Sequence, residues 1–499
     1  MSLISIKNLT FCYLGGTENV FENVSFNIDS DWKLGLTGRN GKGKTTLLKL
    51  LLGQYEYKGE ISKSVTCEYF PYAIRDNKLP VKKIISQINP LYEEWQIEKD
   101  LNLLDIKAFD WDKPLCLFSN GEQTKILISV LFSKEKAFLL IDEPTNHLDR
   151  HGREVLSAYL AKKRSFILVS HDKRFLDNSI DHTLSINKSS ISVNSGNYST
   201  FLVNKERQDE YEYKQNEKLK KSIEQLTQAS KRTSDWADLT EKTKYCGKDD
   251  KSGLRPDRGY IGAKAAKLNK RAKANEKRIN KDISQKSQLL KNIDYASQLK
   301  IESANTRQRL LAVKDLIIKY GNRQVNRSIS FEINRGDRLC LLGKNGSGKT
   351  SVLKAILNEV PFIGIVEGAQ KLNIAYVPQD TSFLKGNLRE FCGTNEIDDA
   401  LFFALLIKMG FKRCQFDNDI NTFSQGQKKK VLLAKSLCIK ADLFVWDEPL
   451  NYIDIITREQ IQEMLTECTA SMVFVEHDAD FCDKIATKQM EIVKFDLKF

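Results

Sequence analysis

The chain has 499 residues, which is room for two to four ordinary domains, each with a sizeable core. Its 78 Lys and Arg outnumber its 65 Asp and Glu, and the formal charge of +13 favours an acidic partner. Apolar runs such as residues 401–407 are shorter than the 18 or more residues that a membrane helix needs, and the N-terminus MSLISIKN does not resemble a signal peptide. These features exclude membrane and secreted classes, so we expect a cytoplasmic protein.

The ten cysteines show no CxxC pair and no histidine at ligand spacing. This pattern favours buried free thiols in a reducing compartment over a metal site or disulfides.

Residues 1–200 alternate short β-branched runs with helical stretches, which predicts an α/β domain with strands at 4–9 and 24–28. A third apolar strand, 34–36, leads into GRNGKGKT at 38–45, and an apolar helix follows at 47–52. This is the context of a P-loop, whose glycines let backbone amides close around phosphates. Lys44 would neutralise the β and γ phosphates, and Thr45 would ligate magnesium.

A later apolar strand ends in two acids, within FLLIDEPTNHLD at 138–149. Asp142 suits magnesium coordination, and Glu143 suits a general base that polarises the attacking water. The alternative interpretation, that the acids cap a helix, does not explain why their spacing from the P-loop recurs later in the chain.

Residues 201–305 differ in composition and predict a linker of two long antiparallel helices, at about 203–245 and 261–301. The stretch 246–259 holds three glycines and a proline and should break the helix. Residues 242–286, bounded by Lys242 and Lys286, carry 15 Lys or Arg against 5 Asp or Glu, a net +10 of the total +13. A charge run is usually a solvated face, but this concentration, with Trp236, Tyr245 and Tyr260 in or near it, favours a polyanion contact.

Residues 306–499 repeat the first domain with almost no drift, beginning with strands at 311–318 and 329–333. Lys44, Asp142 and Glu143 recur 305 residues later as Lys349, Asp447 and Glu448. A second P-loop, GKNGSGKT at 343–350, precedes an apolar helix at 352–356 and supplies Thr350 as a second magnesium ligand. Duplication on this scale predicts two homologous domains.

Two further segments, FSNGEQ at 118–123 and FSQGQK at 423–428, each place a serine 24 residues before the predicted general base. With the P-loops and paired acids, they make the chain resemble an ATP-binding cassette protein with two cassettes. The resemblance implies that ATP, bound with Mg²⁺, lies between the P-loop of one cassette and the signature segment of the other. The third signature position departs from the family pattern at Asn120 and Gln425, and Glu122 replaces the final glutamine of the first copy.

The same resemblance implies roles for residues outside these segments. His171 and His477 stand at the position of the family's switch histidine, 306 residues apart. Tyr13 and Tyr320 stand where the family stacks an aromatic ring on adenine, with core packing as the alternative.

The two copies also differ. Gln379 matches the family's Q-loop, but the first copy has Tyr72 at that position. The second D-loop has Leu450, Asn451 and Tyr452 where the first has Thr145, Asn146 and His147. The cassettes are therefore not expected to be equivalent.

The resemblance assigns three sets of site residues. The catalytic set is Glu143, Glu448, His171 and His477. The nucleotide-binding set is Tyr13, Gly38, Asn40, Gly41, Gly43, Lys44, Thr45, Thr46, Ser119 and Gly121 with Tyr320, Gly343, Asn345, Gly346, Gly348, Lys349, Thr350, Ser351, Ser424 and Gly426. The metal set is Thr45, Asp142, Thr350, Gln379 and Asp447.

The basic linker between the cassettes makes the chain resemble the ABC-F subfamily, which the segment GNYSTF at 196–201 supports. The first cassette has no large arm insertion, and the tract GLRPDRGYIGAKAAKLNKRAK is most similar to the Lsa-type antibiotic-resistance branch. That branch is associated with protection against lincosamides, streptogramin A and pleuromutilins. The resemblance implies a monomer with an intramolecular ATP sandwich that docks on the bacterial 70S ribosome, where residues 242–286 contact rRNA and P-site tRNA.

Three alternatives stay open at this point. A housekeeping translation factor of the same subfamily would manage stalled ribosomes without drug specificity. The ATPase subunit of a membrane transporter would leave the linker without a purpose. A DNA-repair or chromosome ATPase is disfavoured because the linker is short and lacks zinc-type cysteine pairs.

Overall fold

The chain divides into two units, one of Met1–Phe201 with Ala296–Phe499 and one of Leu202–Tyr295. The structure, a computed structural model, describes residues 3–13, 19–107, 109–134, 136–146, 148–186, 191–242, 270, 274, 277–279, 308–321 and 323–495. The two predicted cassettes, 1–200 and 306–499, both belong to the first unit. The exact boundaries of the cassettes and of the linker at 201–305 stay predictions.

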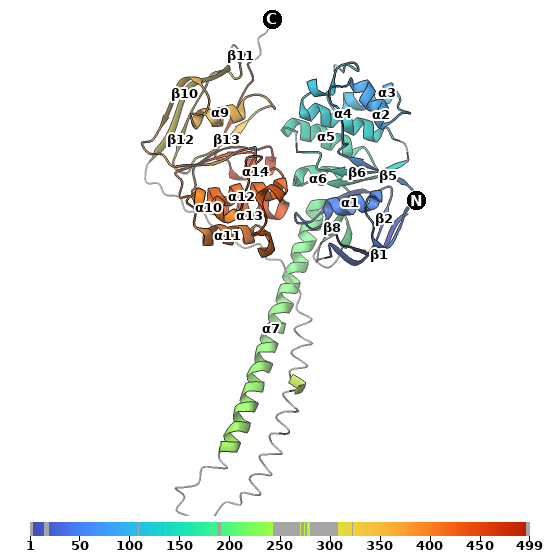
Figure 1. The fold of residues 1–499 in the computed structure, drawn as a ribbon, viewed down its shortest axis with the longest axis vertical. Helices are drawn as coiled ribbons and strands as arrows, with labels where there is room; N and C mark the ends of the chain where they lie inside the picture. The colour runs from blue at the N-terminus through green and yellow to red at the C-terminus, as the bar shows by residue number, and fades with distance from the viewer. Residues whose placement is uncertain are drawn as a thin grey trace, which may run out of the picture. The chain divides into compact units, whose positions relative to one another are not determined.

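The first cassette contains two sheets and six helices between residues 3 and 195, within the described ranges (Figure 1). A six-stranded sheet runs in the order β5-β6-β7-β3-β8-β9, and a three-stranded antiparallel sheet runs β2-β1-β4. The strands are β1 (Leu3–Phe11), β2 (Phe21–Asp29), β3 (Lys33–Thr37), β4 (Lys58–Ser62), β5 (Thr66–Phe70), β6 (Ala137–Asp142), β7 (Phe166–Val169), β8 (His182–Ile186) and β9 (Ile191–Ser195). The helices are α1 (Lys44–Leu52), α2 (Val81–Ile88), α3 (Glu94–Leu103), α4 (Asn120–Phe132), α5 (Arg150–Ala161) and α6 (Lys173–Ser179).

The second cassette repeats this plan. Its parallel sheet runs β15-β16-β17-β13-β18, and its antiparallel sheet centres on β10. The strands are β10 (Arg309–Tyr320), β11 (Arg323–Gln324), β12 (Ile329–Asn334), β13 (Arg338–Leu342), β14 (Phe362–Gly368), β15 (Ile374–Val377), β16 (Leu443–Asp447), β17 (Met472–Val475) and β18 (Lys488–Glu491). The helices are α9 (Lys349–Ile356), α10 (Leu388–Thr394), α11 (Asp399–Lys408), α12 (Gln425–Cys438), α13 (Ile455–Glu467) and α14 (Ala479–Ile485).

The parallel strands are buried on both faces, which explains their continuous apolar sequences. In β16, Phe444 and Trp446 join one core cluster, and Leu443 and Val445 join another on the opposite face. Helices therefore cover both sides of the sheet, as expected when parallel strands are connected by helical crossovers. The α/β fold class predicted from the sequence is confirmed.

The strand order brings the functional loops to one edge of each sheet. β7 pairs with both β3 and β6, so the segments that follow these three strands are neighbours. They are the P-loop, the acids Asp142 and Glu143, and the segment that contains His171. In open parallel sheets, ligands bind at this carboxyl edge.

Helix α7 (Tyr198–Lys242) has 45 residues, or about 68 Å at 1.5 Å per residue, and matches the predicted first helix of the linker within a few residues. Asn197 precedes it and accepts a hydrogen bond from the Thr200 amide at 3.0 Å. The predicted loop at 246–259 lies outside the described residues, as do Tyr245, Tyr260 and most of the basic segment 242–286 and of the predicted helix 261–301.

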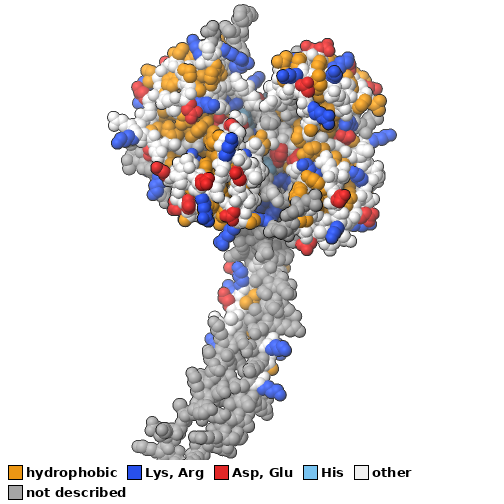
Figure 2. Space-filling model, viewed as in Figure 1, with side chains coloured by type: hydrophobic (Ala, Val, Ile, Leu, Met, Phe, Trp, Pro, Cys, Tyr) orange, Lys and Arg blue, Asp and Glu red, His pale blue; other side chains and the backbone are white. Residues whose placement is uncertain are grey.

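Two expectations concern the surface. Nine of the ten cysteines are described and none of these nine forms a disulfide, but Cys116 and Cys414 are exposed, so the prediction of buried thiols is wrong for these two. Both lie in short 3₁₀ helices outside the sheets, Leu115–Leu117 and Arg413–Gln415. On the face shown in Figure 2, basic and acidic side chains intermingle over the cassettes.

Within the described part of the chain, no helix combines the length and apolarity needed to span a bilayer.

Candidate ATP-binding sites

Each P-loop wraps a lysine that begins a helix. Lys44 Nζ donates to the Gly38 carbonyl at 2.7 Å, and Lys349 Nζ donates to the Gly343 carbonyl at 2.7 Å. Burial lowers the pKa of both lysines, and each remains next to the buried acids of its own cassette. The loop thus concentrates positive charge and backbone donors at a helix N-terminus, the usual protein site for phosphates.

Glycine is required at the end of each P-loop. Gly43 and Gly348 have φ of 93° and 99°, in the left-handed region. A Cβ atom at either position would also lie 2.7 Å from a methyl carbon of Val20 or Val325. Any other residue would therefore strain the backbone and would have to displace Val20 or Val325.

The predicted magnesium ligands lie at the ends of β6 and β16. The Thr45 hydroxyl donates to Asp142 Oδ2 at 2.8 Å, and Tyr69 donates to the same oxygen at 3.2 Å. Asp447 is fully buried, and neither of its oxygens makes a hydrogen bond with any described residue. Burial raises its pKa to about 6. A buried carboxylate without a donor fits the binding of a hard divalent cation, which would supply the missing positive charge.

The predicted general bases share a strained backbone. Glu143 and Glu448 have φ of 51° and 47°, which is rare for residues other than glycine. Their amides donate to the Val169 and Val475 carbonyls at 2.9 and 3.0 Å, and these bonds hold the turn in place. The turn directs each carboxylate toward a switch histidine, with 3.1 Å from Glu143 Oε1 to His171 Nε2 and 3.4 Å from Glu448 Oε1 to His477 Nε2.

The first signature segment faces the second P-loop. A cavity of about 390 Å³ lies between them. Its lining from the first cassette is Ser119, Asn120, Gly121, Asn146 and Leu148, and its lining from the second is Val325, Asn345, Gly346, Gly348, Lys349, Thr350, Ser351, Gln379, Glu448 and His477. The structure thus brings Ser119 and Gly121 of the first cassette to one cavity with Lys349 and Thr350 of the second, residues that the family resemblance placed in one composite nucleotide site.

The second signature segment approaches the first P-loop. The Asn40 side-chain amide donates to the Tyr452 carbonyl at 2.9 Å. A Cβ atom at Gly426 would lie 2.4 Å from that carbonyl oxygen and 3.0 Å from Asn40 Nδ2, so glycine is needed there. This places Gly426 beside the P-loop that contains Lys44.

Comparison with known proteins accords with this geometry. A family profile described as "ABC transporter" matches residues 21–146 and 326–451, together just over half of the chain. The chain belongs to this family of ATP-binding cassette proteins.

The relatives of the cassette protein match it over nearly its whole length. The "Ribosome protection protein VmlR" of Bacillus subtilis is 27% identical, with 98% of this chain and 86% of the relative covered. The "Erythromycin resistance ATP-binding protein MsrA" of Staphylococcus epidermidis is 27% identical, with 92% of each chain covered. "ABC transporter F family member 2" of Arabidopsis thaliana is 25% identical over 98% of this chain and 76% of its own. The prediction of a twin-cassette ABC-F protein is confirmed.

A solved structure shares the fold. The archaeal ribosome recycling factor aABCE1, in a complex with the stalk protein aP1, has a TM-score of 0.62 and 17% identity, with 97% of this chain and 87% of the other covered. At this identity the likeness supports the twin-cassette architecture alone. The matched cassette domains imply ATP binding, normally with Mg²⁺, and ATPase activity.

The environments of the two glutamates differ. Glu448 Oε2 accepts hydrogen bonds from Gln379 Nε2 at 2.7 Å and from Asn451 Nδ2 at 2.5 Å. Burial alone would raise the pKa of Glu448. The hydrogen bonds from His477 and Gln379 and the nearby charge of Lys349 lower this pKa instead. For Glu143, burial and the Asp142 charge raise the pKa to about 8. At neutral pH the Glu448 environment therefore favours the carboxylate, the form a general base needs, and the Glu143 environment favours the acid.

Tyr72 does not replace the missing glutamine of the first cassette. Its ring lies 5.5 Å from Lys134 Nζ, and its buried hydroxyl has no hydrogen-bond partner among the described residues. Burial and the Glu68 charge raise the pKa of this phenol.

The altered second D-loop is matched by an altered switch segment. Thr145 in the first cassette shares a hydrogen bond with Ser170 at 3.2 Å. In the second, Leu450 has no hydroxyl, and its backbone amide donates instead to Glu476 Oε2 at 3.2 Å. Both cassettes thus tie the D-loop to the residue before the switch histidine, by different chemistry.

Both signature serines cap a helix. Ser119 and Ser424 form capping boxes with Glu122 and Gln427 at the starts of α4 and α12. In the first copy, glutamate stands where the second copy has Gln427, and the serine hydroxyl bonds to it. Ser119 Oγ donates to Glu122 Oε2 at 2.8 Å. A carboxylate therefore engages the hydroxyl that faces the second P-loop.

The sequence reasoning missed a pair of arginines. Arg153 and Arg458 are 305 residues apart and bind Asp172 and Asp478, each at 3.1 Å. Arg458 also donates to the Leu450 carbonyl at 2.8 Å, so it joins the D-loop to the residue after the switch histidine. The repeat spacing alone could have identified both.

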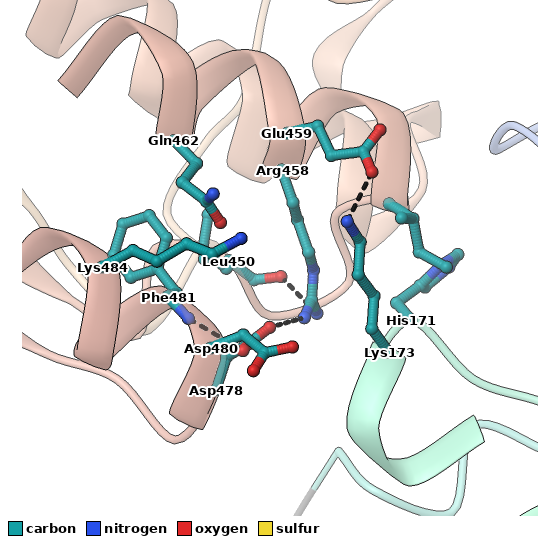
Figure 3. Close-up of a pocket in the computed structure, with 11 residues that line it drawn as sticks. His171, Lys173, Leu450, Arg458, Glu459, Gln462, Asp478, Asp480, Phe481 and Lys484 are labelled. Carbon is teal, nitrogen blue, oxygen red and sulfur yellow. Dashed lines mark hydrogen bonds and ion pairs between the residues drawn. The ribbon is translucent and has the colours of Figure 1, made fainter. Parts of the chain in front are cut away.

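Arg458 lines a small pocket between the cassettes, shown in Figure 3. His171 and Lys173 enter the pocket from the first cassette, and Lys173 Nζ lies 2.5 Å from Glu459 Oε1 of the second. The next residue, Arg174, forms ion pairs with Asp480 and Asp483. Charge pairs thus link the segment after one switch histidine to α13 and α14 of the opposite cassette.

Tyr13 and Tyr320 are not core residues. Their exposed fractions are 44% and 51%, which argues against the packing alternative. Their hydroxyls bond to Thr46 at 2.6 Å and to Ser351 at 3.3 Å, in the helix that follows each P-loop. The rings are therefore available beside the phosphate sites.

Proposed function

We propose that this protein is an ATP-driven ABC-F factor that binds the bacterial 70S ribosome and protects its peptidyl-transferase centre from lincosamides, streptogramin A and pleuromutilins. The observation that carries the proposal is the match to the ribosome protection protein VmlR over 98% of this chain, a span that includes the linker. The name of MsrA, an erythromycin resistance protein, adds a second relative connected with antibiotics.

ATP binding drives the cycle in this proposal. Each P-loop holds the phosphates, the facing signature serine contacts the γ-phosphate, and Tyr13 and Tyr320 stack on adenine. Magnesium, when bound, would neutralise phosphate charge and would be held by Asp142 with Thr45 and by Asp447 with Thr350 and Gln379. Glu143 and Glu448 accept a proton from the attacking water, and His171 and His477 orient them.

The linker is the part of the protein that acts on the ribosome during this cycle. In the ATP-bound form, residues 201–305 enter the E site, and the basic segment 242–286 contacts rRNA and P-site tRNA. The loop between the helices then shifts the peptidyl-transferase centre so that drug leaves. Hydrolysis releases the protein, which acts as a monomer in the cytoplasm.

A housekeeping role on stalled ribosomes is the second candidate. It is favoured by Bacillus subtilis relatives whose names carry no resistance function: the "Putative ATP-binding protein YdiF" is 25% identical over 99% of this chain, and YfmM is 26% identical over 98%.

Deletion of the gene separates the two functions. We expect the deletion strain to become more sensitive to at least one of the three drug classes, and a plasmid copy to restore resistance. The measurement is the minimum inhibitory concentration of each drug with and without the plasmid. Unchanged sensitivity to all three, with slower growth in drug-free medium, would support the housekeeping factor instead.

Adenine stacking is tested at Tyr320. We expect Tyr320→Ala to weaken ATP binding about tenfold, because an aromatic platform contributes about 1–3 kcal/mol to base binding. Tyr320→Phe keeps the ring and removes only the hydroxyl bond to Ser351, so it should bind nearly as well as the original. Titration with a fluorescent ATP analogue measures both. Equal affinity for the alanine variant would remove Tyr320 from the site.

A further inference from the structure

A lysine is buried in the second cassette at a position that the proposed function does not use. Lys429 lies in α12, and only 2% of its surface is exposed. Burial of an ammonium group is costly unless all its protons are bonded. Its Nζ donates to the backbone carbonyls of Pro378 at 2.8 Å and Asp447 at 3.1 Å, and the Gln379 carbonyl lies 3.4 Å away.

These carbonyls belong to two segments that carry site residues. Pro378 and Gln379 follow β15, and Asp447 ends β16, the strand that pairs with β15. Lys429 therefore joins the signature helix to the ends of two adjacent strands. The fixed backbone of Gln379 then aims its side-chain amide at Glu448 Oε2, 2.7 Å away.

The first cassette lacks both parts of this arrangement. The counterpart of Lys429 is Thr124, whose hydroxyl donates to the Asn120 carbonyl of its own helix at 2.9 Å. The counterpart of Gln379 is Tyr72, which makes no hydrogen bond to Glu143. The lysine and the glutamine therefore occur together in one copy and are replaced together in the other.

We propose that Lys429 is a positioning residue that holds the Gln379 amide against Glu448, a second orienting contact that Glu143 of the first cassette lacks. The inference rests on the proposed role of Glu448. On this inference, ATP is hydrolysed faster at the site of Glu448 than at the site of Glu143.

The test uses single-turnover hydrolysis in the full chain with Glu143→Gln, where the reaction reports Glu448. We expect Lys429→Met to slow this turnover by about 10²-fold, as expected when a reacting group is displaced by about 1 Å, with ATP affinity unchanged. Gln379→Ala should slow it similarly. Because both act through one contact, the combined variant should be no slower than either alone.

Matched variants separate positioning from folding. Lys58→Met removes an exposed lysine of the first cassette, away from both P-loops and signature segments, and should leave the measured turnover unchanged. If Lys429→Met does not fold, Lys429→Thr introduces the residue that the first cassette accommodates at this position and should give the same slow turnover. Thermal unfolding of every variant is recorded beside its rate.

Three results would overturn the inference: full turnover for Lys429→Met, additive losses in the combined variant, or normal turnover for Gln379→Ala. A different result would overturn the general-base assignment itself. If Glu448→Gln in the same background still hydrolyses ATP at the full rate, Glu448 is not the base, whatever Lys429 does.

Discussion

Replacement of both Glu143 and Glu448 by glutamine is expected to slow ATP hydrolysis by about 10²–10⁴-fold, the usual contribution of a general base. Glutamine keeps the size of the side chain but cannot accept a proton from water. The P-loop lysines and the signature serines are untouched, so ATP binding should persist and the closed, ATP-bound form should accumulate. Phosphate release and ATP affinity, measured on the same preparation, distinguish these effects.

The trapped variant also tests the partner. We expect it to recover 70S ribosomes from a cell extract with ATP, and imaging of the complex should show the linker in the E site. A matched control is Glu60→Gln with Glu367→Gln, two exposed glutamates at equivalent positions of β4 and β14. The control should hydrolyse ATP at the normal rate. Recovery of the trapped protein without ribosomes would reject the proposed function.

The single variants should be unequal. Glu448 accepts hydrogen bonds from Gln379 and Asn451, which favour its carboxylate form. Burial and the charge of Asp142 raise the pKa of Glu143 and favour its protonated form. Glu448→Gln should therefore remove more of the total hydrolysis than Glu143→Gln.

The sequence predicted the parts of the site that repetition and local pattern determine. The P-loops, the acids and the switch histidines each follow an apolar strand, and parallel strands must place their carboxyl ends along one edge. The structure brings these residues together because β7 lies between β3 and β6. The pairing of these parallel strands can be predicted from their apolar sequences alone, without the position of any side chain.

The features that the sequence could not predict depend on the position and contacts of individual side chains. Tyr72 departs from the family pattern, but only the fold shows that its hydroxyl is buried without a partner among the described residues. Lys429 breaks the repeat at a position where a lysine on a helix would ordinarily be exposed. It is buried because its ammonium group bonds to backbone carbonyls just after β15 and at the end of β16, which are remote in sequence. The exposure of Cys116 and Cys414 likewise depends on how their short 3₁₀ helices pack, which composition does not encode.

Ribosome binding is expected to depend steeply on salt. The segment 242–286 carries a net +10, and neutralisation of about 6 to 10 phosphates would weaken binding about 10³–10⁵-fold between 50 and 200 mM salt, by analogy with duplex DNA. The physical cause is the release of counterions from the nucleic acid when lysine and arginine replace them. Cosedimentation of the trapped variant with 70S ribosomes over a salt series gives the slope of log K against log salt.

Charge-matched variants locate the effect. Replacement of Lys264, Lys267 and Lys270 by glutamine should reduce the slope by about 3, because each phosphate contact contributes about one unit. Replacement of the exposed cassette residues Lys58, Lys162 and Lys371 by glutamine removes the same net charge and should leave the slope unchanged. If association were insensitive to salt, or if both triple variants changed the slope equally, the basic segment would not be the contact. The reason is that counterion release reports only the charges that meet phosphates, whereas a general effect of net charge would not distinguish between the two sets of lysines.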